Sequence, residues 1–308
     1  PLLWSAASDG YQRQAETWKG DGKTEPAGST GGPLSVSPTR LKRDIVDKWI
    51  DSAVAAGYKR NPDYNGSDQE GVGYFQLTLD KGRRCSSAVA YLKPARDRKN
   101  LTVITHAQAE KLLIKDGRTT GVTVNIKGTS QDIMARREVI LSAGTIGSPQ
   151  ILMLSGVGAA DELKQQGINV VHNLPGVGKN LQDHLQARPI FKTDLSTINI
   201  ETNNLLKQGM IALQYALTQT GPMTMAASLG TAFLKTDPTL DTPDIQFHIQ
   251  PFSASAPADG PHKFSAFTAS VLQMRPESTG HIALKSANWR DHPAIHPNYL
   301  ATKLDQET

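Results

Sequence analysis

The sequence contains very little cysteine and no cluster of metal-binding residue types. Its 308 residues include one cysteine, Cys85, which excludes an internal disulfide and any CxxC zinc site. Only His292 and His296 of the eight histidines are four residues apart, and a proline follows each of them, which argues against a helical metal site. We therefore expect no bound metal ion, and we expect a reducing, cytoplasmic compartment.

The chain also lacks a strong charge of either sign and a long apolar helix. It has 33 basic and 29 acidic residues, a net charge of +4, and the basic residues are scattered, so no nucleic-acid partner is predicted. The longest uncharged stretch, residues 139–160, contains four glycines and Pro149, which argues against a transmembrane segment. The sequence leaves the oligomeric state open.

Several common catalytic motifs are missing. The sequence contains no GxGxxG dinucleotide-binding motif, no P-loop, no GxSxG nucleophile elbow and no HExxH zinc-protease motif. An unrelated α/β hydrolase is therefore a weak alternative, which an assay with a generic ester would test.

What the sequence does contain is enough apolar material for a core, since 38% of its residues are hydrophobic and 20% are charged. Glycine, proline and hydroxyl residues predict an extended loop over residues 21–38. The apolar spacing that follows Ser37, an expected N-cap, and Pro38 predicts an amphipathic helix that ends at Gly57.

The rest of the chain alternates between short strands and helices. A strand is predicted over residues 74–79, and Ser148 with Pro149 predicts the start of a helix that ends at Ser155. An antiparallel meander that feeds one buried strand is predicted at residues 101–105, 112–114, 121–126 and 138–141. A helix over 204–218 and strands over 244–250, 266–274 and 280–284 follow. This pattern predicts an α+β fold.

The most informative segment runs from Leu141 to Gly158. A buried strand would deliver Ala143 and Gly144 to a tight turn just before a helix, where a bulky cofactor could approach. Spacing alone also fits a routine strand-to-helix connection of any α/β protein. Both interpretations stay open at this level.

Taken together, these segments resemble the glucose-methanol-choline (GMC) family of FAD-dependent oxidoreductases, in particular its choline dehydrogenase-like branch. Residues 143–158 are similar to the second signature of the family, and residues 174–184 are similar to the segment that usually follows it. Other segments with family character occur in the expected order at residues 32–34, 65–66, 71–76, Arg84 with Ser87, 90–92, 100–103, 275–276 and 297–300. The resemblance covers essentially the whole chain.

The resemblance implies an antiparallel-sheet substrate domain with helices, plus the β-meander part of an FAD-binding domain that lacks its N-terminal Rossmann unit. We expect residues 1–80 to form the first part of the substrate domain with its connecting loops. Residues 81–185 would form part of the FAD-binding domain, and residues 186–308 the truncated remainder of the substrate domain. The chain is interpreted as the middle fragment of a longer enzyme.

The resemblance also implies the oxidation of a primary alcohol to an aldehyde by hydride transfer to flavin, with FAD as the cofactor of the complete protein. No residue matches the family's catalytic segment, so no catalytic residue is assigned. His184 is the one histidine inside a family-like block, but that block resembles a connection between domains. We expect the isolated chain to be inactive and a poor binder of FAD.

Four residues are expected to contact the cofactor by resemblance. The main chain of Ala109 would lie beside the adenine, and Ser142, Ala143 and Gly144 would lie near the ADP portion. Ala109 stands where the family more often has valine, which matters little for a main-chain contact. Recognition of choline would require an aromatic cage or a carboxylate, which the sequence does not place, so the small-molecule substrate stays open between choline and another primary alcohol.

A second interpretation is a non-catalytic binding or interaction module that keeps the same scaffold. Such a module would have to cover the apolar surface against which the missing Rossmann strands would pack. No polar replacement surface is visible in the sequence.

Overall fold

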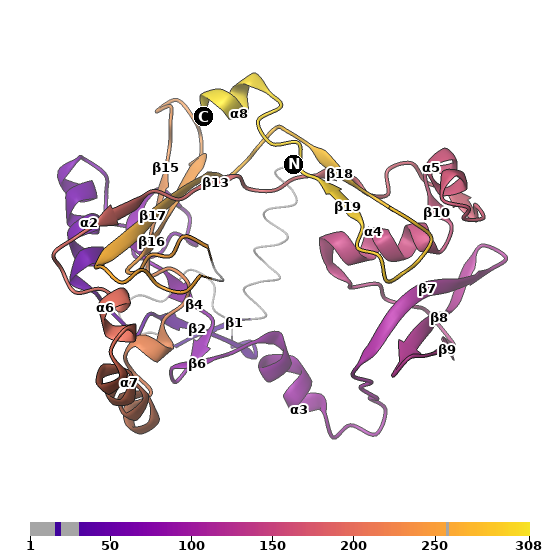
Figure 1. The fold of residues 1–308 in the computed structure, drawn as a ribbon, viewed down its shortest axis with the longest axis horizontal. Coiled ribbons are helices and arrows are strands. Elements are labelled where there is room, and N and C mark those ends of the chain that lie inside the picture. Colours follow the sequence, from indigo (N-terminus) through magenta and orange to yellow (C-terminus); the bar gives the residue numbers. More distant parts are fainter. Residues whose placement is uncertain (1–15, 20–30, 257–258) are drawn as a thin grey trace. The chain divides into compact units, whose positions relative to one another are not determined.

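The computed structural model describes residues 16–19, 31–256 and 259–308. These form two compact units (Figure 1): unit 1 comprises the described residues up to Leu101 and residues 185–275, and unit 2 comprises residues 102–184 and 276–308. Unit 2 thus begins after the expected boundary at residue 81 and includes the end of the chain. The assignment of substrate-domain and flavin-domain roles to these stretches stays a prediction.

Unit 1 contains a six-stranded sheet in which the named strands pair antiparallel. Five strands follow the order β13-β17-β16-β15-β3, and β14 also pairs with β17. The strands are β3 (Gly71–Tyr74), β13 (Gln186–Ala187), β14 (Ile190–Lys192), β15 (Gly230–Leu234), β16 (Ile245–Gln250) and β17 (Ala266–Gln273). The two strands predicted over 244–250 and 266–274 are confirmed as β16 and β17, and the mixed helical and antiparallel-sheet fold is confirmed with them.

Helices and shorter strands complete unit 1. They are β1 (Glu16–Trp18), β2 (Leu34–Pro38), α2 (Asp44–Ala55), β4 (Gln76–Leu77), β5 (Leu79–Asp80), β6 (Arg83–Arg84), the π-helical turn η1 (Ala88–Leu92), α3 (Lys93–Ala95), α6 (Ile198–Thr202), α7 (Leu205–Thr218) and the 3-10 turn η2 (Pro222–Thr224). The helix predicted over residues 204–218 is confirmed as α7. Of the loop predicted over residues 21–38, residues 21–30 lie outside the described residues, and the last five form β2.

Helix α2 covers one face of the sheet. Val46 and Ile50 are fully buried there, in one apolar cluster with Val72 and Ile249. A Cβ added to Gly230 would lie 2.9 Å from Val46 Cγ1, so the helix can approach β15 this closely only because that position is glycine. One face of the sheet is therefore buried against α2 in the core.

Two local predictions in unit 1 are wrong. Ser37 is not a helix N-cap, because Ser37 and Pro38 lie in β2 and α2 begins only at Asp44. Pairing with β4 keeps the backbone extended there. The single strand predicted over 74–79 is broken, because the chain changes partners: β3 pairs with β15, β4 with β2, and β5 with β6.

The opposite face of the sheet carries an aromatic cluster. Phe233 adjoins the buried Ala232 in β15, and His248 adjoins the buried Ile249 in β16. Side chains alternate between the faces of a strand, so Phe233 and His248 lie on the face opposite α2. The Tyr64 ring lies 5.1 Å from that of Phe233 and 6.1 Å from that of Phe75, and the rings of Phe75 and His248 are 5.3 Å apart. The Gln76 N–H donates a 2.8 Å hydrogen bond to the Tyr64 hydroxyl. Aromatic side chains thus cover part of this second face.

Unit 2 is built around a three-stranded antiparallel meander, β7-β8-β9. Two tight turns join its strands: Asp116, Gly117, Lys127 and Gly128 all have positive φ, as two-residue hairpin turns require. The elements of unit 2 are β7 (Ala107–Lys115), β8 (Arg118–Ile126), β9 (Thr129–Met134), α4 (Gly144–Leu154), β10 (Val157–Gly158), α5 (Ala160–Gln165), β11 (His172–Asn173), β12 (Lys179–Leu181), β18 (Gly280–Ala283), β19 (Ala294–His296) and α8 (Lys303–Glu307).

Two strands predicted for this unit are wrong. Residues 101–105 and 138–141 form no strand, because no strand within the described ranges pairs with them. Val103 and Ile140 are accordingly 49% and 80% exposed. The meander ends instead with β9, which was not predicted because most of its residues are polar and all are exposed.

Helix α4 begins earlier than predicted. It starts at Gly144, which has a φ of +78°, so Ser148 lies inside the helix and is followed there by Pro149. The predicted end is confirmed, because Ser155 is the C-cap and Gly156 takes a φ of +83°.

Ser155 joins helix α4 to strand β7. Its Oγ accepts a 2.8 Å hydrogen bond from the Leu112 N–H and donates a 2.5 Å bond to the Ile151 carbonyl oxygen. Ser155 is buried, so water does not readily replace these bonds. One hydroxyl therefore fixes the end of the helix at the edge of the strand.

Replacing Ser155 with alanine should loosen this contact. The Leu112 N–H would lose its acceptor, and we expect a loss of about 1 to 3 kcal/mol in local stability. Hydrogen exchange at the Leu112 amide should become faster, whereas Ser130→Ala, which removes an exposed hydroxyl bonded to Glu110, should leave it unchanged. Equal exchange at Leu112 in all three proteins would contradict this role of Ser155.

The stability of unit 1 should fall at high pH because of Tyr64. Burial raises the pKa of Tyr64 to about 12, against about 10 in an unfolded chain. The folded state therefore keeps Tyr64 neutral, and its contribution is complete below about pH 10 and is lost as the pH rises toward about 12. Urea unfolding from about pH 9 to 11.5 should show this loss, and Tyr64→Phe should show less of it; a Tyr64 phenol that ionises near pH 10 by its absorbance would contradict the prediction.

Candidate functional site

The turn before helix α4 contains three of the residues predicted to contact a cofactor. Ser142, Ala143 and Gly144 are all exposed. The Ala143 N–H donates a 3.1 Å hydrogen bond to Ser148 Oγ, and a Cβ placed on Gly144 would meet no atom within 4 Å. The first N–H groups of a helix have no partner within it, and the helix dipole favours negative charge at this end. The turn can therefore accept a phosphate group against its backbone.

The fourth predicted residue, Ala109, lies on the strand that α4 contacts. It is half-buried in β7, opposite Val124, where the register shifts between Ala109 and Lys111. Among the described residues, β7 pairs only with β8, so part of its main chain faces an open edge. All four residues lie in unit 2. Helix α4 and strand β7 contact each other and are joined by the hydrogen bond of Ser155. The contacts of the four residues with a cofactor stay a prediction.

His184 is the last residue of the first segment of unit 2, residues 102–184, and it is exposed. The neighbouring Asp183 carboxylate accepts a hydrogen bond from the Tyr299 hydroxyl. The chain passes from one unit to the other directly after His184, which agrees with its interpretation as part of a connection. No catalytic role is assigned to it.

The second face of the unit 1 sheet carries polar side chains that were not predicted as site residues from the sequence. Thr231 and Ser270 are 1% and 0% exposed, and in the part of the chain that the structure describes Ser270 Oγ has no hydrogen-bond partner. Gln246 Nε2 donates to Thr231 Oγ1 at 3.4 Å, and Arg188 Nη2 donates to Gln250 Oε1 at 3.4 Å. Such hydroxyl, amide and guanidinium groups can orient a neutral or anionic polar molecule.

A sequence signal for this face exists in the alternation of β16. The polar residues Gln246, His248 and Gln250 occupy every second position, which places them on one face of a strand. The alternation that predicts the strand therefore also shows which of its residues form the polar face.

Three aromatic residues of the second half of the chain have different surroundings. Phe247 packs against the core under α2, 6.0 Å from the Trp49 ring. Phe264 is 40% exposed and stacks on His262 at 4.8 Å. Trp289 lies outside the strands, with the Arg290 guanidinium 4.1 Å from its ring centre. None of these contacts forms a cage around an external cation.

Among the residues that the structure describes, no group of three or more histidine, cysteine, aspartate or glutamate side chains could hold a metal ion. No helix there combines the length and apolar character needed to cross a membrane.

Comparisons with known proteins agree with the resemblance to the GMC family. A family model described as GMC oxidoreductase matches residues 4–186. The alcohol dehydrogenase [acceptor] of Pseudomonas putida is 39% identical over 285 residues, which cover 91% of this chain and 51% of that protein. The mitochondrial choline dehydrogenase of Homo sapiens is 39% identical over 279 residues, which cover 90% of this chain and 46% of that protein. The chain thus spans about half the length of the curated relatives it matches.

Solved structures share the fold. Pyridoxine 4-oxidase from Mesorbium loti matches with a TM-score of 0.81 and 25% identity, over 100% of this chain and 57% of that one. An FAD-dependent oxidoreductase from Chaetomium thermophilum matches with a TM-score of 0.82 over 98% of this chain and 60% of that one, and its 20% identity makes this a likeness of fold alone. Since the family model covers more than half of the chain, the chain belongs to the GMC oxidoreductase family.

Proposed function

We propose that this chain is the middle part of an FAD-dependent enzyme that oxidises a primary alcohol to an aldehyde. The observation that carries the proposal is the 39% identity, over about nine tenths of the chain, to an alcohol dehydrogenase and a choline dehydrogenase. Membership of the GMC oxidoreductase family supports the choice of cofactor. When bound, FAD supplies the site that accepts hydride from the alcohol carbon.

The residues of unit 2 fit the phosphate-bearing part of FAD. The exposed turn at Ser142–Gly144 offers backbone N–H groups at a helix N-terminus, which favours a pyrophosphate. The space in which a Cβ of Gly144 would lie is open, so a ligand can approach the backbone there. The main chain of Ala109, on the edge strand that α4 contacts, would hold the adenine.

The polar face of the unit 1 sheet supports an alcohol as substrate. We propose that unit 1 serves as the substrate domain and that this face orients the substrate hydroxyl and its neighbouring polar groups. Gln246 is half-buried and Arg188 is exposed, and amide and guanidinium groups bind polar partners by hydrogen bonds. The hydroxyl proton must go to a base, and none of the described residues is assigned that role.

The exposed apolar segments of unit 2 argue against the non-catalytic module. Ile140 is 80% exposed and Val103 is 49% exposed, in two segments whose composition predicts strands. A stand-alone binding module would leave this apolar surface in water. Strands supplied by a longer protein would pair with these segments and cover them.

The proposed activity can be tested with two proteins. A protein of the relatives' length that contains this sequence should retain FAD and reduce an artificial electron acceptor when given a primary alcohol. Residues 1–308 alone, incubated with FAD and the same alcohol, should give no turnover. A longer protein without bound flavin or alcohol oxidation would contradict the proposed function, and turnover by residues 1–308 would contradict the expected inactivity of this part.

Gly144→Val should lower flavin retention by the longer protein. The added side chain would occupy the open space over the turn and would strain a residue with positive φ. Gly117→Val is a matched control, because Gly117 also has positive φ and open space around it but lies in the turn between β7 and β8. The ratio of flavin to protein absorbance should fall only in Gly144→Val; an equal fall in both variants would contradict a specific role of Gly144.

A further inference from the structure

A positive charge lies on the polar face of the unit 1 sheet, the face opposite α2. Strands β13 and β14 pair with β17 in one continuous register. Arg188 lies between these two strands, two residues after Gln186, which pairs with Leu272, so the register places Arg188 opposite Ser270. The Arg188 guanidinium accordingly reaches the polar face, where its Nη2 donates to Gln250 Oε1 at 3.4 Å.

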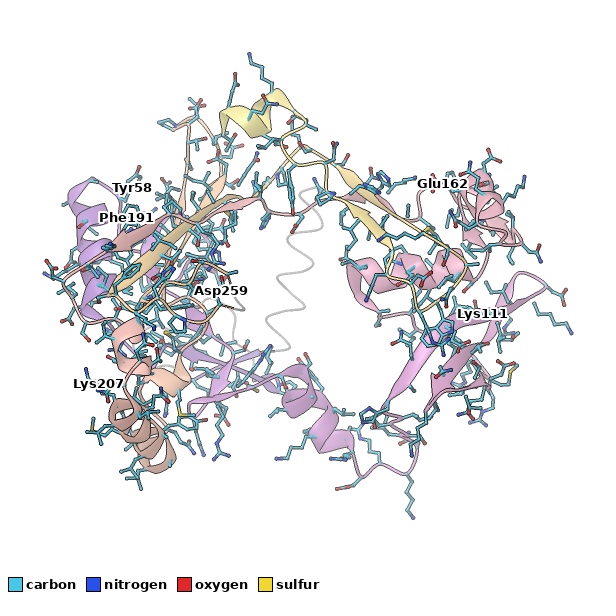
Figure 2. The ribbon with its side chains drawn as sticks, in the orientation of Figure 1. Tyr58, Lys111, Glu162, Phe191, Lys207 and Asp259 are labelled. Atoms are coloured by element: carbon cyan, nitrogen blue, oxygen red, sulfur yellow. The ribbon has the colours of Figure 1, made fainter. Side chains whose placement is uncertain are left out.

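The aromatic residues of the other face support this placement. Phe191 of β14, labelled in Figure 2, stacks on Phe267 with 5.3 Å between the ring centres. Phe267 packs against the core cluster beside α2, so Phe191 lies on the α2 face. Side chains alternate between the two faces along a strand, and Arg188, three residues earlier, therefore lies on the polar face.

Arg188 has donors available for a further group. It is exposed, and in the part of the chain that the structure describes the ion pairs are formed by other arginines and by lysines. The bond to the neutral amide of Gln250 leaves the positive charge of Arg188 uncompensated. A guanidinium also has several N–H donors, of which this bond uses one.

The strands of this sheet carry no negative charge. None of β3, β13, β14, β15, β16 and β17 contains an aspartate or a glutamate. Asp244, directly before β16, is engaged elsewhere, because its carboxylate accepts a 2.8 Å hydrogen bond from the Thr236 N–H. The amides of Gln186, which is exposed, and Gln246, which is half-buried, are neutral. The charge that this face offers to a ligand is therefore positive.

The aromatic cluster on the same face offers no site for a cation. A quaternary ammonium group binds over accessible ring faces. Tyr64 and Phe233 are only 8% and 5% exposed, and their rings pack on each other. The ring of Phe75 packs against those of Tyr64 and His248. The ring faces are thus used within the cluster.

We propose that Arg188 determines the charge preference of the alcohol site, so that the substrate is a primary alcohol that also bears a carboxylate. The inference rests on the proposed function, because it takes the polar face as the face that binds the substrate. Arginine binds a carboxylate through paired N–H donors. The same charge repels the quaternary ammonium group of choline. Choline is therefore a poor substrate, although a choline dehydrogenase is 39% identical to this chain.

The test compares four alcohols as substrates of a protein of the relatives' length that contains this sequence. They are 4-hydroxybutanoate, its neutral amide, choline and 3,3-dimethylbutan-1-ol, which is the neutral carbon analogue of choline. Each pair differs mainly in charge. We expect kcat/KM to be about tenfold or more higher for 4-hydroxybutanoate than for its amide, and for 3,3-dimethylbutan-1-ol than for choline.

Two variants separate the charge of Arg188 from its place in the fold. Arg188→Gln should bring both ratios close to one and leave kcat/KM for the two neutral alcohols within about twofold, because it removes a charge that these alcohols lack a partner for. Arg188→Lys should keep the order of the four alcohols, with a smaller advantage for the carboxylate, because an ammonium group has no paired donors. A loss of all four activities together would indicate a structural role instead and would contradict the proposal.

The matched control compares Arg188→Glu with Lys48→Glu. Both replace a positive charge with a negative one, but Lys48 is exposed on α2, which covers the other face of the sheet. Arg188→Glu should make choline a better substrate than its neutral analogue. Lys48→Glu should leave both ratios as in the wild-type protein.

The outcomes distinguish this inference from the proposed function. A wild-type protein that oxidises choline as well as its neutral analogue, or 4-hydroxybutanoate no better than its amide, would overturn the inference alone. Ratios that Arg188→Gln leaves unchanged would do the same. A protein that retains flavin but oxidises none of the four alcohols would overturn the proposed function, and the inference with it.

Discussion

The close approach of helix α2 to strand β15 determines which face of the unit 1 sheet is buried in the core and which face can carry polar side chains. Val46 and Ile50 are fully buried, and the contact is possible only because Gly230 has no side chain at the crossing point. Once α2 occupies one face of the sheet, all apolar residues of that face are committed to the core. Thr231, Ser270 and their polar neighbours can then be placed only on the other face.

Much of this arrangement could be predicted from local sequence. The helix α7, the strands β16 and β17 and the glycine turns of the meander follow from periodicity and from residues that tolerate positive φ. The bounds of α2 could not, because the pairing of Ser37 with Leu77 depends on a strand distant in sequence. Residues 101–105 and 138–141 have strand composition, but a strand also needs a partner, and composition does not supply one.

The candidate site was also predictable from the sequence only in part. The turn at Gly144 and the strand of Ala109 were identified because the family resemblance is carried by contiguous motifs. The alternation of β16 shows which of its residues share a face, but not that they meet Thr231 and Ser270, because these come from β15 and β17 and meet β16 only through pairing such as that of Thr231 with His248. A side chain's own strand reveals which face it occupies, whereas its neighbours depend on register.

The interleaving of the two units along the chain sets an order in which they can form during synthesis. Val72 of β3 pairs with Ala232 of β15, and the whole stretch from residue 102 to 184 is synthesised between them. The meander of unit 2 has only neighbouring strands to join and forms locally. Strand β3 and the apolar side of α2 must wait, uncovered, until β15 leaves the ribosome. Unit 1 is therefore the part of the nascent chain that keeps apolar surface exposed for longer, and such surface promotes aggregation.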